Sequence, residues 1–597
     1  MHRRKWQRIL PATGLLLWVA MTHAAGRVPA DAVYRNGYVY TADSRDSVRQ
    51  AIAVRAGRLV YVGSNSGVAA FVGSHTEVHD LGGRMLMPGL TDGHMHPLAG
   101  GSALTKCNLN YERLDVATLQ ARIQACLDKS RDREPDGWLE VSNWFQEAMI
   151  GGTTTSHATL DALDTRRPIM VYSSFGHTVL VNSRALALAN ITAATPDPKG
   201  GVIERDAQGQ PTGVLQDAAF EQVFAAIPKA TPEQNAAAAI AALDALRRQG
   251  VTTVLDAAAD ETTISAFAAA RQAGKLTARV HFAVLIRPPE VKDPAAAIAR
   301  ARDLAHRFDS GPVRPEADLT VRNIKLFLDG VIAAPAMTGA MLEPYFENRG
   351  SADRPHWVPG TNRGPDVYFA APQLAQLVTM AADAGFEPHM HADGDRAVRA
   401  GLDAIAALRR THPADLIRAA IAHDEIVDPA DFARYRAVGA IPVLSFQWEK
   451  PAPDTVEGAR DYLGPARYRY VEPAGFLARQ GARIAFGSDW PVDPLNEWFA
   501  LKVGVTRTNA PAAGPQYAGR LSEDQGLTRR QVLRAATINA AYELHQDDQT
   551  GSLEVGKLAD FIVLDRNVFE IPAEDIANVR VLRTVVGGQV VYDATSR

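Results

Sequence analysis

Eight short apolar segments recur along most of this chain, and they constrain its fold more than any other feature. They are rich in β-branched and aromatic side chains, and alanine-rich stretches with helical character, such as 234–248 and 373–384, lie between them. Strands that alternate with helices in this way are typical of a (β/α)8 TIM-type barrel in the α/β class. The expected barrel strands are 85–96, 251–255, 280–286, 324–328, 386–391, 419–423, 441–445 and 484–486.

The two ends of the chain have a different pattern, with short strand-like segments separated by turn signals. These segments fall within residues 32–62 and 559–592. Neither end alone supplies enough strands for a stable sheet. We therefore expect one small β-sandwich made from residues 25–84 and 551–597, with the barrel, residues 85–550, inserted between its two parts.

The stretch between the first and second expected barrel strands is far too long for a single loop. It predicts an inserted subdomain over about residues 105–231. The two cysteines of the chain, Cys107 and Cys126, both fall in this insertion. Two cysteines are too few for a cysteine zinc site, and both a disulfide and a pair of free buried thiols fit the pattern.

The first residues have the composition of a secretory signal peptide. Arg3, Arg4 and Lys5 precede the apolar run 9–21, and small residues follow it. The apolar run is short for a membrane anchor. We expect residues 1–24 to be removed and the mature protein to be periplasmic or secreted, without stable membrane association. The Arg3-Arg4 pair leaves both the Sec and the Tat export routes open.

Charge and composition narrow the choice of partners. The net charge is -4 and the isoelectric point is near 6.5, which gives no reason to expect a nucleic acid or an anionic membrane surface as partner. A small-molecule substrate is expected, and a homo-oligomer stays open.

Polar residues with metal-binding chemistry stand where the expected barrel strands end. The carboxyl ends of barrel strands meet at one rim, where active sites of such barrels lie. Side chains alternate along a strand, so His94 and His96 point to the same side. Neutral imidazole is a common ligand of zinc and similar metals. The residues expected to converge are His94, His96, Lys325, His391, His423 and Asp489.

With these residues in place, the chain resembles the amidohydrolase superfamily, and within it the amidohydrolase 3 group of metal-dependent hydrolases. The resemblance covers nearly the whole mature chain. It is carried by four motifs, one of which departs from the group because Asp393 stands where an apolar residue is usual. The motifs are 175–177 with 181–183, 325–330, 391–395 and 551–560.

The resemblance implies a role for each matching residue. His94, His96 and Asp489 would bind one divalent metal, and His391 and His423 a second one. Lys325 would be carboxylated by carbon dioxide and would bridge the two ions, which would be zinc, manganese or cobalt, with two Zn²⁺ as the expected pair. If Lys325 is instead an ordinary lysine, the site would hold a single metal.

The same resemblance implies hydrolysis of a non-peptide C–N bond, such as an N-acyl, N-formyl or cyclic amide, by a metal-activated hydroxide. Asp489 would take the proton of the water and pass it to the leaving nitrogen. His177 would be a second catalytic residue that contacts the substrate and donates to the developing oxyanion, or it would only hold its own loop through Asn182. Weaker candidates for substrate contact are Trp144, Phe145, His389, Gln447, Trp448 and Trp490, and His389 could instead support a ligand from behind.

Three alternatives remain. Ester or lactone hydrolysis would use the same residues. A single-metal deaminase is disfavoured because Lys325 is present and Asp393-Gly394-Asp395 follows His391. A non-catalytic exported binding protein would have lost at least one of the ligands, and none is missing here. The sequence does not identify the substrate.

Overall fold

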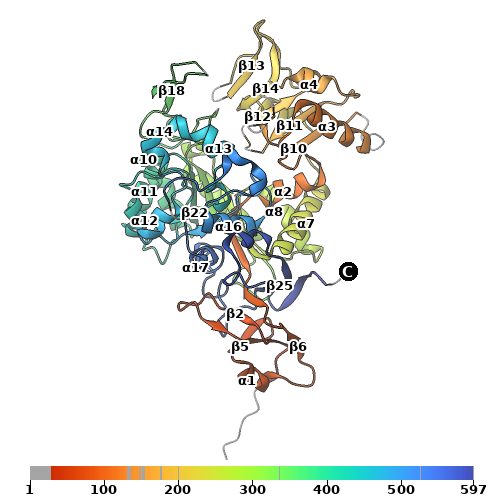
Figure 1. The fold of residues 1–597 in the computed structure, drawn as a ribbon, viewed down its shortest axis with the longest axis vertical. Coiled ribbons are helices and arrows are strands. Elements are labelled where there is room, and N and C mark those ends of the chain that lie inside the picture. Colours follow the sequence, from red (N-terminus) through yellow and green to blue (C-terminus); the bar gives the residue numbers. More distant parts are fainter. Residues whose placement is uncertain are drawn as a thin grey trace, which may run out of the picture.

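The computed structural model describes residues 28–595, apart from residues 131–135, 147–148, 151–154, 175, 177, 199–200, 335, 352 and 525. The predicted signal peptide, residues 1–24, lies outside the described residues. Figure 1 shows a unit with β10 to β14 at one end, a central body, and a strand-rich unit with β2, β5 and β6 at the other end. Within the part of the chain that is described, no helix is long and apolar enough to cross a membrane.

The central body is built on a parallel sheet, which has eight strands among the described residues. This confirms the expected (β/α)8 barrel. The sheet follows chain order, and its last strand contacts its first, so that it closes on itself. The strands are β8 (Leu90–Met95), β15 (Val251–Ala259), β16 (Arg279–Leu285), β17 (Leu319–Phe327), β20 (Glu387–Ala392), β21 (Ala420–His423), β22 (Ile441–Leu444) and β23 (Ala485–Phe486).

Helices between these strands bury one apolar face against the sheet, as amphipathic helices do. In α7, Ala239, Leu243 and Leu246 are buried, and Phe267 of α8 packs against Phe282 of β16 with ring centroids 5.8 Å apart. The principal helices are α7 (Pro232–Gln249), α8 (Glu261–Gln272), α9 (Pro294–Phe308), α10 (Ala371–Asp383), α11 (Asp395–Leu408), α12 (Phe432–Val438), α15 (Ala474–Arg479) and α16 (Glu497–Thr506).

The first expected strand, 85–96, is in fact two strands in different sheets. β7 (Met85–Pro88) pairs with strands from the chain ends, whereas β8 belongs to the barrel. The change occurs at Gly89, whose amide donates to the carbonyl of Asp560, while the next amide, of Leu90, donates to Gly250 at the base of the barrel. The single continuous strand was therefore a wrong prediction, because apolar character alone does not show which sheet a segment joins.

Strands from both ends of the chain share one mixed sheet, in the order β26-β25-β24-β7-β2-β3, beside a second sheet, β5-β4-β1-β6. β24 pairs antiparallel with β7, and the buried ion pair between Arg279 and Asp560, 2.7 Å apart, ties this unit to the barrel. The strands are β1 (Ala32–Arg35), β2 (Tyr38–Tyr40), β3 (Val48–Arg49), β4 (Ala51–Arg55), β5 (Arg58–Gly63), β6 (Glu77–Asp80), β24 (Phe561–Leu564), β25 (Val581–Val586) and β26 (Gln589–Asp593).

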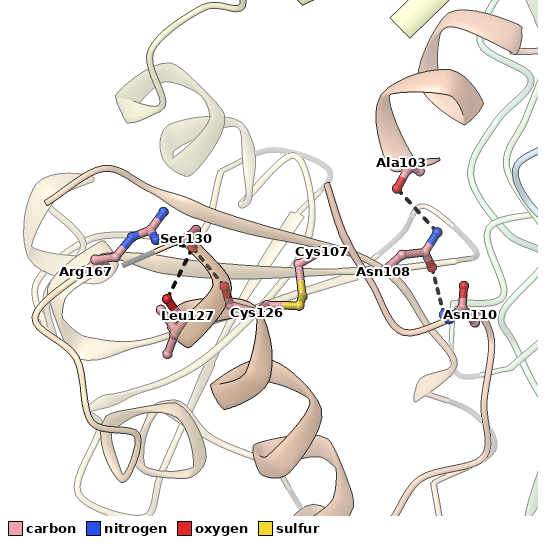
Figure 2. The surroundings of a disulfide bond; sticks show 8 residues. All are labelled: Ala103, Cys107, Asn108, Asn110, Cys126, Leu127, Ser130 and Arg167. Atoms are coloured by element: carbon pink, nitrogen blue, oxygen red, sulfur yellow. Dashed lines mark hydrogen bonds between the residues drawn. A yellow bond between two sulfur atoms is a disulfide. The ribbon is translucent and has the colours of Figure 1, made fainter. Parts of the chain in front are cut away.

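A third sheet follows α2 (Pro97–Thr105) and has the order β13-β14-β12-β11-β10-β9. Cys107 of β9 and Cys126 of α3 (Val116–Ser130) form a disulfide, which decides between the two alternatives left by the sequence (Figure 2). The strands are β9 (Cys107–Asn108), β10 (Leu139–Trp144), β11 (Ile169–Ser173), β12 (Thr178–Val181), β13 (Gly201–Arg205) and β14 (Pro211–Asp217).

Candidate metal centre

The first group of expected ligands meets where β8 and β23 end. Nε2 of His96 lies 3.2 Å from Oδ1 of Asp489, and Nε2 of His94 lies 3.5 Å from the same oxygen. His94 and Asp489 are buried, whereas the His96 side chain is 26% exposed. The three ligand atoms are close enough to surround one ion.

Backbone hydrogen bonds hold this group in place. The amide of Asp489 donates to the carbonyl of His94, and the amide of His96 donates to the carbonyl of Trp490, each at 2.7 Å. The two segments approach so closely that a Cβ on Gly487 would lie 2.4 Å from Cβ of His94. The carboxyl of Asp92 accepts from the amides of both His94 and Ser488, so that it clamps the two strand ends together.

A second group consists of His391, His423 and Asp393, whose ligand atoms also lie close together. The rings of His391 and His423 have centroids 4.6 Å apart. Asp329, at the end of β17, accepts from the amides of Asp393 and Gly394 and so fixes the loop that carries the group. The sequence marked Asp393 only as a departure from the family pattern, and that departure was the signal that could have placed it in the site.

The hydrogen positions on His391 follow from its neighbours. Its Nε2 lies 3.0 Å from the carbonyl oxygen of Gly330, 3.6 Å from Asp329 and 3.7 Å from Asp393. A carbonyl oxygen can only accept, so the ring hydrogen is on Nε2 and the lone pair is on Nδ1. In the second group, Nδ1 is therefore the nitrogen of His391 that is able to bind a metal.

Two ligand residues have a left-handed backbone, which is rare for residues other than glycine. His423 has φ +81° and Asp489 has φ +53°. Such conformations cost about 1–3 kcal/mol each and persist where the surrounding structure enforces them, often at functional sites. They turn both side chains from the strand ends toward the centre of the rim.

Lys325 lies beside the first group and is fully buried. Its Nζ is 3.4 Å from Nε2 of His94 and 4.6 Å from the ring centre of Phe327. Burial lowers the pKa of Lys325 to about 7, although Asp489, Asp393 and Asp256 act in the opposite direction. The amine is therefore far less costly to deprotonate than an exposed lysine.

The residues of the two ligand groups form the floor of a cavity of about 480 Å³, and the fully buried Lys325 is not among its lining residues. Its walls come from the barrel, including Phe327 and Trp448, and from the inserted sheet, including Ser142, Asn143 and Ser173. Four carboxyl groups other than Asp489 also line it, and burial raises the pKa of all four, with nearby carboxyl groups acting in the same direction. Among the described lining residues none is Lys or Arg. The four carboxyl groups belong to Asp393, Glu425, Asp454 and Glu472.

Most of the weaker substrate candidates lie away from this cavity. Trp144 is fully buried in the core of the insertion, where its Nε1 donates to the sulfur of Met149. Trp490 packs into the barrel core over Gly100, and the Gln447 amide donates to the carbonyl of Ser488. None of these three lines the cavity, because their side chains turn into the protein.

Two other candidates have different outcomes. His389 is fully buried, with its Nε2 2.7 Å from Nδ1 of His94, and it does not line the cavity. Trp448 does line the cavity, and its ring stacks on His423 at 5.3 Å. His177, the second catalytic candidate, lies outside the described residues, so its role stays a prediction.

The donor set fits divalent cations. It offers imidazole nitrogens and carboxylate oxygens, which suit zinc and similar ions. Nδ1 of His423 and Oδ1 of both Asp393 and Asp489 are buried without a hydrogen-bond partner among the described atoms. Buried polar atoms normally have a partner, and a cation would supply one here.

The chain is similar to known proteins in sequence and in fold. Protein LONG AFTER FAR-RED 3 of Arabidopsis thaliana is 28% identical over 596 residues, which is 98% of this chain and 95% of that protein. N-substituted formamide deformylase of Arthrobacter pascens is 25% identical and covers 95% of this chain and 99% of its own. The structure of an uncharacterized metal-dependent hydrolase from Pyrococcus horikoshii OT3 has the same fold, with a TM-score of 0.68 at 21% identity, over 91% of this chain and 99% of that one.

The amidohydrolase family model matches residues 77–592, from the start of β6 into β26. Because this match spans most of the sequence, the protein belongs to the amidohydrolase family.

Proposed function

We propose that this protein is a metal-dependent hydrolase that cleaves a non-peptide C–N bond, with an N-acyl or N-formyl amine as the substrate class. The observation that carries the proposal is the meeting of two ligand groups on the floor of one cavity, with the buried Lys325 3.4 Å from His94 of the first group. The relative named N-substituted formamide deformylase supports the choice of an amide substrate.

The proposal includes two ions, most simply Zn²⁺, held by His94, His96 and Asp489 and by His391 and His423. Lys325 would join them as a carbamate. The neutral amine would attack carbon dioxide: an N–C bond would form, one C=O π bond would break to give a carboxylate oxygen, and the proton lost by the nitrogen would pass to solvent water. A charged ammonium has no lone pair for a metal, whereas the resulting carbamate is a carboxylate-like ligand. When bound, the ions lower the pKa of a water toward neutrality and polarise the substrate carbonyl.

The protein side chains then handle the protons. Asp489 has its Oδ1 at the floor of the cavity, without a hydrogen-bond partner among the described atoms. Asp489 takes a proton from the attacking water and later gives it to the leaving nitrogen, which departs as a neutral amine. Phe327 and Trp448 give the cavity an apolar wall beside the ligand groups.

The cavity lining favours some amides over others. A substrate with a free carboxylate would stand beside Glu425 and Glu472 without a described lysine or arginine to pair with it. An unpaired buried charge is costly. We therefore propose neutral or amine-bearing N-acyl and N-formyl compounds as substrates, in preference to N-acyl amino acids.

A substrate panel tests this proposal. The zinc-loaded mature protein is assayed with N-benzylformamide, with the matched N-formylphenylalanine, and with an ester and a lactone of similar size. Faster turnover of the formamide than of the carboxylate compound is expected. Turnover of the esters alone would establish ester hydrolysis in place of the C–N reaction, and turnover of none would contradict the proposed substrate class.

We also propose that the protein is exported, as residues 1–24 predict. The Cys107–Cys126 disulfide supports export, because disulfides persist in oxidising compartments such as the periplasm. Cell fractionation with an antibody to the mature chain checks this. Recovery of the full-length chain in the cytoplasm alone would contradict it.

A further inference from the structure

Two buried side chains, those of His389 and Glu543, lie one after the other behind His94 of the first ligand group. Nε2 of His389, on β20, lies 2.7 Å from Nδ1 of His94. Nδ1 of His389 in turn lies 3.1 Å from Oε1 of Glu543, the last residue of α18 (Ala540–Glu543). All three side chains are at most 2% exposed, so no bulk water separates them.

If His94 binds a metal, its neighbours determine which nitrogen carries the hydrogen in the imidazole rings of His94 and His389. Nε2 of His94 faces Asp489 and Lys325, so this nitrogen must offer its lone pair to the ion. Neutral imidazole has one N–H, which must then be on Nδ1 and donate to Nε2 of His389. His389 therefore carries its own hydrogen on Nδ1, the nitrogen beside Oε1 of Glu543. That oxygen can accept in either protonation state of the carboxyl group.

The surroundings of Glu543 offer its carboxyl group one close polar contact. Among the described residues, no hydrogen bond is formed by either oxygen of Glu543 or by Nδ1 of His389, and the 3.1 Å approach of Nδ1 to Oε1 is the close polar contact of Glu543. The other oxygen, Oε2, lies where a side chain at position 93 would be, since a Cβ on Gly93 would be 2.1 Å away. Gly93 lies between Asp92 and the ligand His94 on β8, so the glycine admits the carboxyl group directly behind the ligands.

We propose that Glu543 and His389 are positioning residues of the metal centre, which act through His94 to hold its Nε2 lone pair on the first ion. This inference rests on the metal binding included in the proposed function. Groups that orient a metal-ligating histidine from behind typically change metal affinity or activity by roughly 10- to 100-fold when they are removed.

The test measures zinc affinity of the full chain by competition with a chelator, together with the absorption spectrum of the cobalt-substituted protein. Glu543→Met removes the accepting oxygen at similar size, whereas Glu543→Gln keeps an accepting oxygen. His389→Phe removes the acceptor for His94 directly. Glu387→Met is the matched control, because Glu387 is also buried, on β20, and also contacts a histidine, His545, at 2.7 Å, away from the metal centre.

Glu543→Met and His389→Phe should each weaken zinc binding at one site by roughly 10- to 100-fold and change the cobalt spectrum. Glu543→Gln and Glu387→Met should stay close to the parent protein. Unchanged zinc affinity in Glu543→Met would overturn the proposal, as would an equal loss in Glu387→Met. If Glu543→Met does not fold, His389→Phe decides between the same two results.

Zinc affinity is measured without substrate, so the test of this inference does not depend on whether the proposed hydrolysis occurs. A parent protein that binds zinc but hydrolyses no amide contradicts the reaction and leaves the positioning role to be decided by the variants. A parent protein that binds no metal overturns both.

Discussion

Nζ of Lys325, on β17, lies 3.4 Å from Nε2 of His94, on β8, and both side chains are buried. Their strands are not neighbours in the sheet, so the contact spans the interior of the barrel. The contact places the Lys325 amine beside the first ligand group, which a ligand that bridges the two metal ions would have to reach.

Replacing Lys325 with methionine should lower the metal content toward one ion per chain, because the bridging group is lost while most other ligands remain. Elemental analysis of dialysed protein measures this. Lys502→Met is a suitable control, since Lys502 is also buried but pairs with Glu574 outside the site. Equal metal content in Lys325→Met and the parent protein would count against the bridge.

Asp489→Asn should keep bound metal but lose turnover by roughly 10²- to 10⁴-fold, because the amide retains an oxygen ligand but cannot carry the proton. Steady-state kinetics and metal analysis on the same sample separate the two effects. Asp524→Asn, at a buried aspartate that accepts from the amide of Gly475, should leave turnover near that of the parent. Near-normal turnover in Asp489→Asn would remove its role in proton transfer.

The disulfide should stabilise the inserted unit. Its cysteines are 19 residues apart, and closing a loop of that length contributes about 3 kcal/mol in the chain-entropy account. β9 pairs with Ser142 of β10, which lines the cavity, so loss of the disulfide should also raise KM. Thermal unfolding of Cys107→Ser/Cys126→Ser, with and without reductant, measures the effect. If a reductant lowers the Tm of the double variant as much as that of the parent protein, the loss of stability in reductant has a cause other than the disulfide.

His281, on β16, should make the protein less stable in mild acid. Burial lowers its pKa to about 3, and Arg322 and Arg279 contribute in the same direction. Between pH 6.5 and about 3 the unfolded chain binds a proton that the folded chain does not, so the free energy of unfolding falls by about 1.4 kcal/mol per pH unit as pH decreases. At pH 5 the loss is about 2 kcal/mol.

His281→Leu should remove this loss, and urea unfolding of metal-free protein at pH 7 and pH 5 measures it. His306→Leu, at an exposed histidine of α9, is the control. If the difference between the two pH values is the same in His281→Leu as in the parent protein, the buried histidine is not the cause.

Local pattern was enough to predict the barrel, because each strand and helix has its own composition and period. The same pattern placed His94, His96, Lys325, His391 and His423 at strand ends, where barrel geometry makes them converge. It failed at residues 85–96, because an apolar run does not reveal that the chain leaves one sheet and enters another at Gly89.

The aromatic candidates show a second limit. Trp144 and Trp490 are large aromatic residues of the kind that often lines a pocket. In the structure each is buried in a separate core, which is the more favourable environment for a large apolar ring. Only the folded chain shows which way such a side chain turns.

The sequence by itself determined the strand-and-helix order and the residue types able to bind metal, since these depend on neighbours along the chain. The tertiary structure decided that the ligand atoms of Asp393, His391 and His423 lie close together and that Glu543 lies 3.1 Å from His389, behind His94. Those relationships join residues hundreds of positions apart or on different elements, and they exist only once the strands have closed into a barrel.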